Sequence, residues 1–545
     1  MRRARYNSPK EAGWMLLNRK LRARLKREWG QKPAERQMDE DLIEDVSLYW
    51  RSLAKNLPEY RQVDDITWND LDMSQVFQRM NFTQSVVGSE ALYAMLRDTG
   101  CEDAELSARE KMIRLFQTDE EARLEAQLAL RYIGKSHFHG AIGYMFTPEK
   151  RYPAHGWLYY LLSLLPVVLI VAGLFNAVFF IPFMALVAIN IFAYYRTSLT
   201  WQREINAVKH IASVLNCAQR LCHSRCTALE AVQQPIRELT RQLHGIRGWC
   251  TLLAAELPGE LSILTDYLRI IFMLNMLSLC RIVGRLRNCN LQMQELYQWI
   301  GQIDACLALA ALRTSNPGLC QPVFVADKVL DARDLTHPLV ANAVANDCLW
   351  RQNTLITGSN ASGKSTFIKA VAINAILAQT VLTCYASSLR TCRARVMTSM
   401  AVRDNILAGE SYFVAEIRSL KRILEAMSGA WAVFCFVDEI LRGTNTVERI
   451  AASSSVLADL EDRHCLCMAA THDVELTRML QSAYANWHFR EQITPAGVAF
   501  TYRLCEGPAS SRNAIALLEQ MGFPPQVVQN AQSAIQRFES EGRWR

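Results

Sequence analysis

One long stretch of the sequence lacks charge altogether. The 39 residues from Trp157 to Tyr195 contain no Asp, Glu, Lys or Arg. A single helix of this length would measure about 58 Å, roughly twice the hydrocarbon thickness of a bilayer, whereas about 20 residues suffice for one span. The absence of charge therefore predicts a transmembrane helical hairpin over residues 157–195. The alternative is a very hydrophobic hairpin buried inside a folded domain.

The residues that flank this segment suggest its orientation. Lys150 and Arg151 precede it, and Arg196 and Arg203 follow it. Because positive residues mark the cytoplasmic side of a span, both ends of the hairpin are expected there, in an inner or plasma membrane. Aromatic residues near both ends would lie at the same interface. We expect the turn near Gly173–Asn176 and a multi-pass protein with both termini cytoplasmic.

Residues 1–35 lack the apolar run of a secretory signal, although they are rich in Lys and Arg. This segment is predicted to be a basic amphipathic helix. Two interpretations stay open for it. It is a solvated surface helix, or it contacts the anionic headgroups of the inner leaflet.

The cysteines show no paired CxxC spacing of a structural zinc site, although the chain has 16 of them. Cys217, Cys222 and Cys226 lie near His223, which leaves a metal site as the less favoured alternative. Several other cysteines lie within apolar runs, where cysteine behaves as a small hydrophobic residue. We therefore expect reduced, structural cysteines. The net charge of +7 permits an anionic partner but does not require one.

The chain also lacks tandem repeats and low-complexity tracts. Its predicted secondary structure changes along its length. Residues 36–150 read as mainly helical and polar, and residues 196–318 as long helices with few Gly or Pro. From about residue 320 to 540, short apolar strands alternate with amphipathic helices, which is typical of an α/β domain. The prediction is a multidomain chain in which a transmembrane hairpin interrupts a helical region and an α/β domain follows.

A glycine-rich phosphate-binding motif, G-x-x-x-x-G-K-S, begins at Gly358. A short apolar strand precedes it and an amphipathic helix follows, which is the context that such a P-loop requires. Backbone N–H groups of the loop would hold phosphate oxygens, and Lys364 would reach the β- and γ-phosphates of ATP. The residues predicted to bind ATP are Gly358, Ser359, Asn360, Ala361, Ser362, Gly363, Lys364, Ser365 and Thr366.

Two further segments complete a predicted ATPase site. A β-rich apolar run ends in Asp438 and Glu439, and a second buried run precedes His472. Ser365 and Asp438 would hold Mg²⁺, while Glu439 would orient or polarise the attacking water. His472 is the second predicted catalytic residue, placed to contact the γ-phosphate. All of these groups would lie at the carboxyl ends of parallel strands, where α/β sheets bind ligands.

These motifs resemble the ATPase domain of the MutS mismatch-repair family, which belongs to the ABC class of P-loop ATPases. The strongest match is DEILRGTNTVERIAASSSVLADL at 438–460, and others are THPLV, SGKST, GESYFVAEI and ATHDVEL. The resemblance is strong in the last 220 residues. It extends weakly back to about residue 66, where the helical segments resemble the core and lever regions of that family.

The resemblance implies a homodimer in which the partner completes each ATP site. It places Ser411, Gly443 and Thr444 at the dimer interface, and it implies ATP hydrolysis with Mg²⁺. An aromatic residue that stacks on adenine in the family is replaced near Ala343. Tyr502 is a candidate to supply a ring instead.

The chain departs from the family in two places. The 65 residues before the resemblance contain no Phe-x-Glu wedge, which the family uses to read mismatches. In place of the family's DNA-clamping arm, the apolar hairpin interrupts the core. Initiation of mismatch repair is therefore not expected.

Two hypotheses about function remain. The first is a membrane-anchored MutS-like ATPase that binds mismatched or branched DNA, as the resemblance implies. Arg281, Arg285 and Arg287 would touch phosphates, or they form a solvated helix face. The second is an ATP-driven switch that acts on a membrane protein partner without binding DNA. A transporter half is disfavoured because the two spans contain few polar groups.

Overall fold

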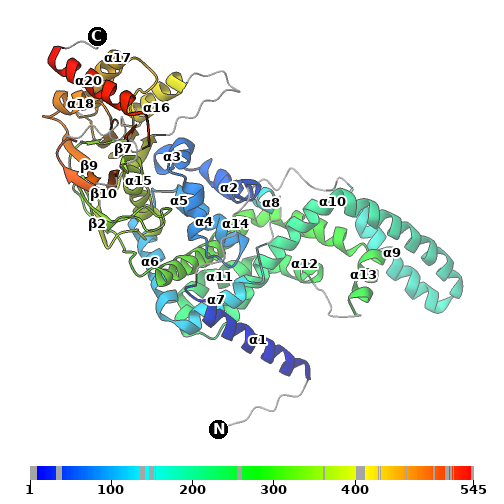
Figure 1. Ribbon diagram of the computed structural model, residues 1–545. Coiled ribbons are helices and arrows are strands. Elements are labelled where there is room, and N and C mark those ends of the chain that lie inside the picture. Colours follow the sequence, from blue (N-terminus) through cyan, green and yellow to red (C-terminus); the bar gives the residue numbers. More distant parts are fainter. Residues whose placement is uncertain are drawn as a thin grey trace, which may run out of the picture. The chain divides into compact units, whose positions relative to one another are not determined.

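The chain folds into two compact units (Figure 1). The first comprises residues 1–56, 80–94 and 107–315, and the second residues 57–79, 95–106 and 316–545. The computed structural model describes residues 9–31, 40–135, 141–146, 153, 155–254, 261–359, 362–400, 412–427, 429, 431–461, 463–494, 497–509, 515, 518–519 and 521–541.

The described chain is helical as far as Ser315, which confirms the predicted helical region ahead of the α/β domain. In most of these helices apolar residues recur every three or four positions and form a stripe that is buried against neighbouring helices. The α-helices are α1 (Pro9–Glu28), α2 (Glu40–Ala54), α3 (Asp65–Asp70), α4 (Met73–Met80), α5 (Val86–Arg97), α6 (Asp103–Thr118), α7 (Glu120–Leu130), α8 (Ala141–Phe146), α9 (Gly156–Phe175), α10 (Phe180–His223), α11 (Glu230–Gln242), α12 (His244–Ala254), α13 (Leu261–Ile271) and α14 (Leu274–Ser315).

Helices α9 and α10 form the uncharged hairpin, which projects from the helical unit in Figure 1. The turn between them is made by Asn176, whose side chain accepts a hydrogen bond from the N–H of Val178. Both helices are long and apolar enough to cross a membrane. Their apolar side chains point outward, and Phe175 at the tip is 88% exposed. Helix α10 runs on past the uncharged segment, with a kink at Trp201.

A buried polar chain joins three helices of the first unit. The hydroxyl of Tyr297 in α14 donates to a carboxylate oxygen of Glu90 in α5 at 2.6 Å. Nε2 of His210 in α10 lies 3.3 Å from the same hydroxyl. Because Glu90 is buried away from water, its pKa rises to about 8. The carboxyl group is therefore protonated in neutral solution.

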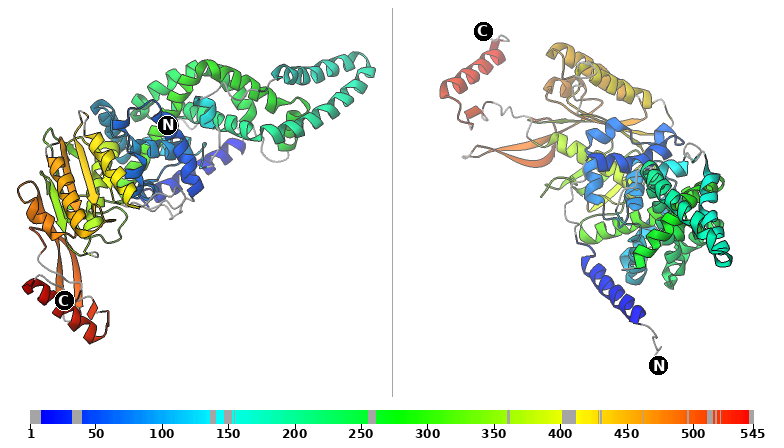
Figure 2. Two further views of the ribbon diagram at one scale, coloured as in Figure 1. Left: turned by 90° about the horizontal axis from the view of Figure 1, so that it is seen from above. Right: turned by 90° about the vertical axis from the view of Figure 1, so that its right-hand side faces the viewer.

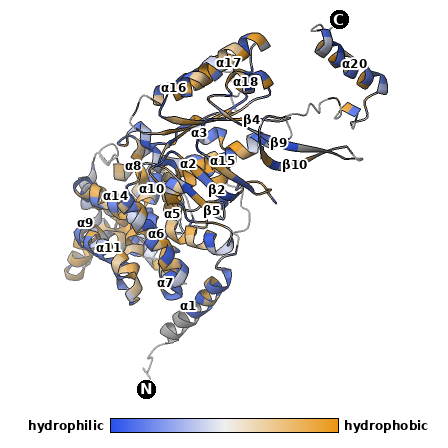
Figure 3. Cartoon of the chain, turned by 90° about the vertical axis from the view of Figure 1, so that its left-hand side faces the viewer, coloured by the Kyte–Doolittle hydropathy of each residue, from blue (hydrophilic) through white to orange (hydrophobic). Residues whose placement is uncertain are grey.

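Part of the basic charge of α1 is neutralised within the first unit. Arg22 forms an ion pair with Glu121 of α7 at 2.9 Å and a second with Glu125, and Lys26 pairs with Glu120. Figure 3 colours the described end of α1 mostly blue, for hydrophilic side chains. These pairs fix one face of α1 against α7.

The second unit is an α/β domain with two sheets. This confirms the predicted change from helices to alternating strands and helices near residue 320. In the six-stranded sheet the order is β10-β9-β4-β8-β7-β6, and in the four-stranded sheet it is β1-β5-β2-β3. In the larger sheet only β10 runs antiparallel to its neighbour. The strands are β1 (Val323–Phe324), β2 (Leu330–Leu335), β3 (Asn346–Trp350), β4 (Thr354–Thr357), β5 (Ser388–Thr391), β6 (Arg395–Ser399), β7 (Val433–Asp438), β8 (Cys465–Ala470), β9 (Ala485–Thr494) and β10 (Gly497–Glu506).

Strands β4, β7 and β8 lie inside the domain. All of their residues are buried except Asp438 at the end of β7, which is partly buried. The ring of Trp350 packs against Phe434 and Phe436 of β7, with centroids 5.0 and 5.2 Å apart. Strands β9 and β10 extend beyond the rest of the sheet (Figure 2). The α-helices of this region are α15 (Lys364–Val381), α16 (Tyr412–Ala426), α17 (Thr446–Glu461), α18 (Val474–Met479) and α20 (Pro525–Glu541).

Candidate functional site

A tight loop joins the central strand β4 to α15. Its first residue, Gly358, has φ +142°, and Gly363 at the N-cap of α15 has φ +105°. Residues other than glycine are strained at such positive φ values because of their Cβ atom. A Cβ on Gly358 would also lie 2.9 Å from the hydroxyl of Ser362. The backbone conformation of the loop therefore requires glycine at both of these positions. Asn360 and Ala361 lie outside the described residues.

Lys364 begins α15, and its side chain folds back into the loop. Its Nζ donates to the carbonyl oxygens of Gly358 and Ser359, both at 2.7 Å, and the residue is only 4% exposed. Buried ammonium groups need such partners or an anion. The helix N-terminus beside it adds the positive end of the helix dipole. The arrangement favours a phosphate group at the mouth of the loop.

Asp438 ends β7 beside the first turn of α15. Its carboxylate accepts a hydrogen bond from the hydroxyl of Ser365, so the two predicted magnesium ligands are brought together. Burial raises the pKa of Asp438, and the hydrogen bond from Ser365 partly offsets this rise. Its Oδ1 is buried and has no hydrogen-bond partner among the described residues. Thr366 lies in the same turn of α15 and lines the adjoining cavity.

Glu439 follows directly and contacts His472, the residue predicted at the end of the next strand. Oε1 of Glu439 lies 2.8 Å from Nε2 of His472, and Oε2 lies 3.0 Å from Nη1 of Arg442. Glu439 has φ +55°, a left-handed conformation that is uncommon for a residue with a side chain. This conformation turns the carboxylate out of the strand direction. The two predicted catalytic residues thus lie against each other at the ends of β7 and β8.

The turn after Glu439 is held by a buried carboxylate that the sequence did not reveal. Glu416 of α16 is 3% exposed and accepts hydrogen bonds from the backbone N–H groups of Leu441, Arg442 and Gly443. Burial raises the pKa of Glu416, and these hydrogen bonds oppose the rise. The residue belongs to the GESYFVAEI segment, but no spacing in it predicts this contact.

The residues predicted to lie at the dimer interface differ in their surroundings. A Cβ on Gly443 would lie 3.0 Å from Cβ of Phe413, so the backbone comes close to α16 there. The hydroxyl of Thr444 donates to Glu448 at 3.1 Å, at an exposed position. Ser411 lies outside the described residues. The described residues therefore place Gly443 and Thr444 on the loop between β7 and α17.

A cavity of about 660 Å³ adjoins this site. It is lined by Lys364, Ser365, Asp438 and Glu439, and also by segment 337–346 and Tyr502. A Cβ built on Gly363 would lie 3.2 Å from Cδ1 of Tyr502, so this ring lies close to the loop. The lining thus combines charged groups with apolar and aromatic surface. A nucleotide needs this combination.

Tyr502 is held in the cavity wall by Asn346. The amide of Asn346 donates to the carbonyl of Tyr502 at 3.0 Å and accepts from the N–H of Leu504 at 2.8 Å. Tyr502 has φ +53° and lies within an irregularity of the β9–β10 pairing. Ala343 lines the same cavity, where its methyl group leaves room for a ring.

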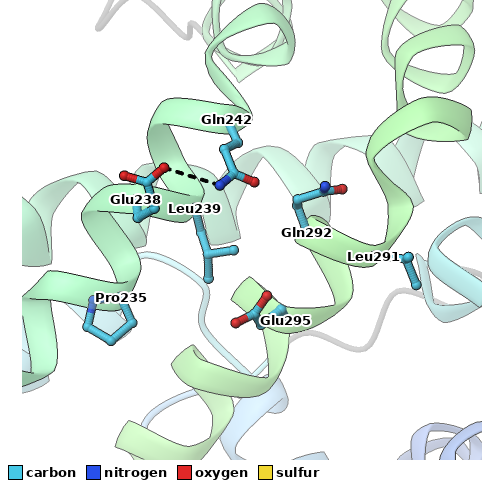
Figure 4. A pocket seen from close by; sticks show the side chains of 7 residues that line it. All are labelled: Pro235, Glu238, Leu239, Gln242, Leu291, Gln292 and Glu295. Atoms are coloured by element: carbon cyan, nitrogen blue, oxygen red, sulfur yellow. Dashed lines mark hydrogen bonds between the residues drawn. The ribbon is translucent and has the colours of Figure 1, made fainter.

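A second, smaller hollow of about 270 Å³ lies in the helical unit (Figure 4). Its wall contains Glu238 and Glu295 but no cationic side chain, and Gln242 donates to Glu238 at 3.2 Å. It has no group that would complement phosphate. Among the described residues, no three His, Cys, Asp or Glu side chains lie close enough to hold a metal ion, so Cys217, Cys222 and His223 form no such cluster.

The fold and the site define a class: an α/β domain in which a glycine-rich loop, a buried lysine and strand-end carboxylates meet at one edge of a largely parallel sheet. Residues 354–539 match the sequence model of a family described as MutS domain V. Through this C-terminal domain, the chain is similar to the MutS family.

Curated relatives agree with this assignment. The chain is 30% identical over 259 residues to the DNA mismatch repair protein MutS of Erythrobacter litoralis, which covers 44% of this chain and 29% of that protein. It is 29% identical over 264 residues to MutS of Geobacillus thermodenitrificans, covering 46% and 28%. It is 27% identical over 249 residues to MutS of Thermus thermophilus, covering 45% and 30%. The chain thus spans less than a third of the length of these relatives.

Proposed function

We propose that the chain is a membrane-anchored, MutS-like ATPase that binds and hydrolyses ATP. One observation carries this proposal: the buried ammonium of Lys364, the Ser365–Asp438 pair and the Glu439–His472 pair all line or adjoin one cavity. Residues far apart in the chain meet at the carboxyl ends of parallel strands, where ligand sites form in α/β domains.

ATP would bind with its phosphates at the loop. Lys364 would exchange its two carbonyl partners for β- and γ-phosphate oxygens, and the N–H groups at the start of α15 would hold the β-phosphate. The adenine of ATP would lie against the ring of Tyr502, since Tyr502 lines the cavity and is 46% exposed. Ala343 lines the same cavity.

Ser365 and Asp438 suit a magnesium ion. Mg²⁺ prefers oxygen ligands, and the buried Oδ1 of Asp438 has no hydrogen-bond partner among the described residues. When bound, the ion would neutralise charge on the β- and γ-phosphates. The hydroxyl of Ser365 already lies against the carboxylate that would share the ion.

Hydrolysis would depend on Glu439 and His472. Glu439 would accept a hydrogen bond from the attacking water and orient it in line with the γ-phosphate. His472 and Arg442 hold the two oxygens of this carboxylate, so they restrict the directions in which it points. His472 would then contact the γ-phosphate once ATP is bound.

Two copies of the chain would act together. Gly443 and Thr444 lie on the loop that follows Glu439, so a partner pressed against this loop would bear on the catalytic carboxylate. Ser411 would reach the partner's ATP. In this arrangement, ATP binding draws the subunits together and hydrolysis releases them.

Helices α9 and α10 would anchor the protein in the inner or plasma membrane through residues 157–195. Their length, hydropathy and outward-facing apolar side chains support two spans. The positive residues at both ends favour a cytoplasmic position for the ATPase domain and the termini.

Two substrates of the ATP-driven motion are compatible with these features. The relatives are named for DNA mismatch repair, which favours mismatched or branched DNA. The apolar hairpin within the helical unit favours instead a switch that acts on a membrane protein partner. A binding assay with homoduplex, mismatched and junction DNA across a salt series separates them. Absence of binding at low salt would exclude DNA, since phosphate contacts are strongest there.

The ATP assignment has its own test. Binding of a fluorescent ATP analogue to the detergent-solubilised protein should require Mg²⁺ and an intact Lys364. The Lys364→Ala variant should lose binding, whereas Lys421→Ala, an exposed lysine of α16, should retain it. If Lys364→Ala binds the analogue as tightly as wild type, the loop is not the phosphate site.

A further inference from the structure

The short helix α13 presents apolar side chains to the outside. Ile263, Leu264, Tyr267 and Leu268 are 59%, 54%, 60% and 40% exposed. At 100° per residue these four positions fall within one side of the helix. Asp266 and Arg269 lie on the opposite side and pair at 3.4 Å. The helix is therefore amphipathic and leaves its apolar face exposed, whereas a helix that covers a water-soluble core buries that face. On the polar side, the side chain of Asp266 is also 66% exposed and that of Arg269 is 12% exposed.

An amide of α10 ties α13 to the uncharged hairpin. Asn190 of α10 is fully buried, and its Nδ2 donates to the carbonyl of Ile271 at 2.6 Å and to the carbonyl of Leu162 at 2.9 Å. Ile271 is the last residue of α13, and Leu162 lies in α9. The carbonyls at a helix end lack intrahelical partners, and leaving one unpaired in hydrocarbon is costly. Asn190 removes that cost at Ile271.

The depth of this contact follows from the sequence of α10. Asn190 lies six residues before Arg196, the first charged residue after the hairpin, or about 9 Å along the helix. Ile271 is thus held against the uncharged part of α9 and α10, not at its charged boundary.

The chain then turns. Met273 has φ +48°, α14 begins at Leu274, and the bend between α13 and α14 is 69°. On α14, Asn275 donates to the hydroxyl of Tyr194 at 3.2 Å. Further along, the guanidinium of Arg281 lies 4.7 Å from the ring centre of Tyr160, one of the aromatic residues near the start of α9. Helix α14 thus makes a cation–aromatic contact near the start of the hairpin.

We propose that α13 and the turn at Met273 form a re-entrant membrane element, and that Ile263, Leu264, Tyr267 and Leu268 contact the acyl chains of the bilayer that holds α9 and α10. The occupant is lipid because this face belongs to a helix tied to the uncharged hairpin, which itself exposes apolar side chains throughout. Irregular backbone at membrane depth needs a protein partner for its polar groups, and Asn190 is that partner. This inference rests on the proposed membrane anchoring.

Photocrosslinking of the full-length protein in phosphatidylethanolamine–phosphatidylglycerol vesicles tests the inference. Benzoylphenylalanine replaces one residue at a time: Leu264 or Leu268 on the apolar face, Asp266 on the polar face, or Leu174 at the hairpin tip. After irradiation, mass spectrometry identifies lipid or protein adducts. Lipid adducts are expected at Leu264, Leu268 and Leu174, with loss of most of the adduct at Asp266.

The other outcomes are separable. Lipid adducts at Leu174 without any at Leu264 and Leu268 would overturn the re-entrant element and leave the anchoring intact. Adducts to a second copy of the chain at Leu264 would overturn it in favour of a protein contact. Failure to label Leu174 would overturn the anchoring itself, and the re-entrant element with it.

The role of Asn190 is tested in the same vesicles. Asn190→Leu keeps the size of the side chain but removes its donor, so the lipid adduct at Leu268 should be lost while that at Leu174 persists. The neighbouring Ile189→Leu, at an exposed position of α10, should change neither adduct. An unchanged adduct at Leu268 in Asn190→Leu would show that Asn190 does not hold α13 in the bilayer.

Discussion

Nε2 of His472 lies 2.8 Å from Oε1 of Glu439, although the two residues are separated by 33 positions in the sequence. The contact joins the ends of the neighbouring parallel strands β7 and β8. In the proposed mechanism, His472 orients this carboxylate and contacts the γ-phosphate of bound ATP.

The variant His472→Ala should therefore lose hydrolysis more than ATP binding. A donor that acts mainly in the transition state contributes about 100-fold to kcat, and its removal should leave KM for ATP nearly unchanged. Steady-state kinetics on the solubilised protein measures both constants. His464→Ala, at an exposed position before β8, is the matched control. A change confined to KM would assign His472 to ATP binding instead.

Glu416 should stabilise the turn that follows Glu439 in the same site. Glu416→Ala would leave the N–H groups of residues 441–443 without their acceptor, at a cost of about 1–3 kcal/mol. We expect a lower melting temperature of the α/β unit and a reduced kcat, because the turn next to Glu439 loses its support. Glu425→Ala, an exposed glutamate of the same helix, should have neither effect. Unchanged kcat in Glu416→Ala would separate the turn from catalysis.

Tyr502 should contribute to nucleotide affinity through its ring. Stacking of an aromatic side chain on a base is worth about 1–3 kcal/mol, so Tyr502→Ala should weaken ATP binding by about 5- to 150-fold. Tyr502→Phe keeps the ring and should bind as wild type does. Fluorescence titration with an ATP analogue gives the two dissociation constants. Equal affinity of Tyr502→Ala and Tyr502→Phe would remove Tyr502 from the base site.

The buried Glu90 should make the stability of the helical unit depend on pH. Its pKa is about 8 in the folded protein and near 4.5 when unfolded, so the folded state binds the proton more tightly. The resulting stability is fully present below the unfolded pKa and is lost as pH rises through about 8, at a slope of up to about 1.4 kcal/mol per pH unit.

Thermal melts from pH 5 to 9 measure this dependence. The melting temperature of wild type should fall across this range, and Glu90→Gln should flatten the fall because the amide does not titrate. A wild-type profile that matches that of Glu90→Gln would mean that Glu90 is not the titrating group.

Some of this organisation could be predicted from the sequence because its signals are local. The uncharged segment is continuous. The alternation of strands and helices after residue 320 is indicated by the hydropathy pattern of neighbouring residues. The motif from Gly358 to Ser365 is likewise contiguous, so its backbone requirements could be anticipated at Gly358 and Gly363.

The remaining features depend on contacts between distant residues. Glu416 holds a turn 26 residues away, and Asn346 holds Tyr502 across 156 residues. No periodicity encodes such pairs. Helix α13 lies within the predicted helical region 196–318, but its proposed place in the membrane could not be predicted, because its 11 residues are too few for a span and include Asp266 and Arg269. The hydrogen bond from Asn190 links it to the hairpin.

The most direct test of the account is ATP hydrolysis by Glu439→Gln. The amide keeps the shape of the side chain but is too weak a base to polarise water. The variant should bind Mg²⁺ and ATP as wild type does and hydrolyse ATP at least about 100-fold more slowly. Glu461→Gln, at an exposed position at the end of α17, should hydrolyse ATP at the wild-type rate. A wild-type rate in Glu439→Gln would contradict the account.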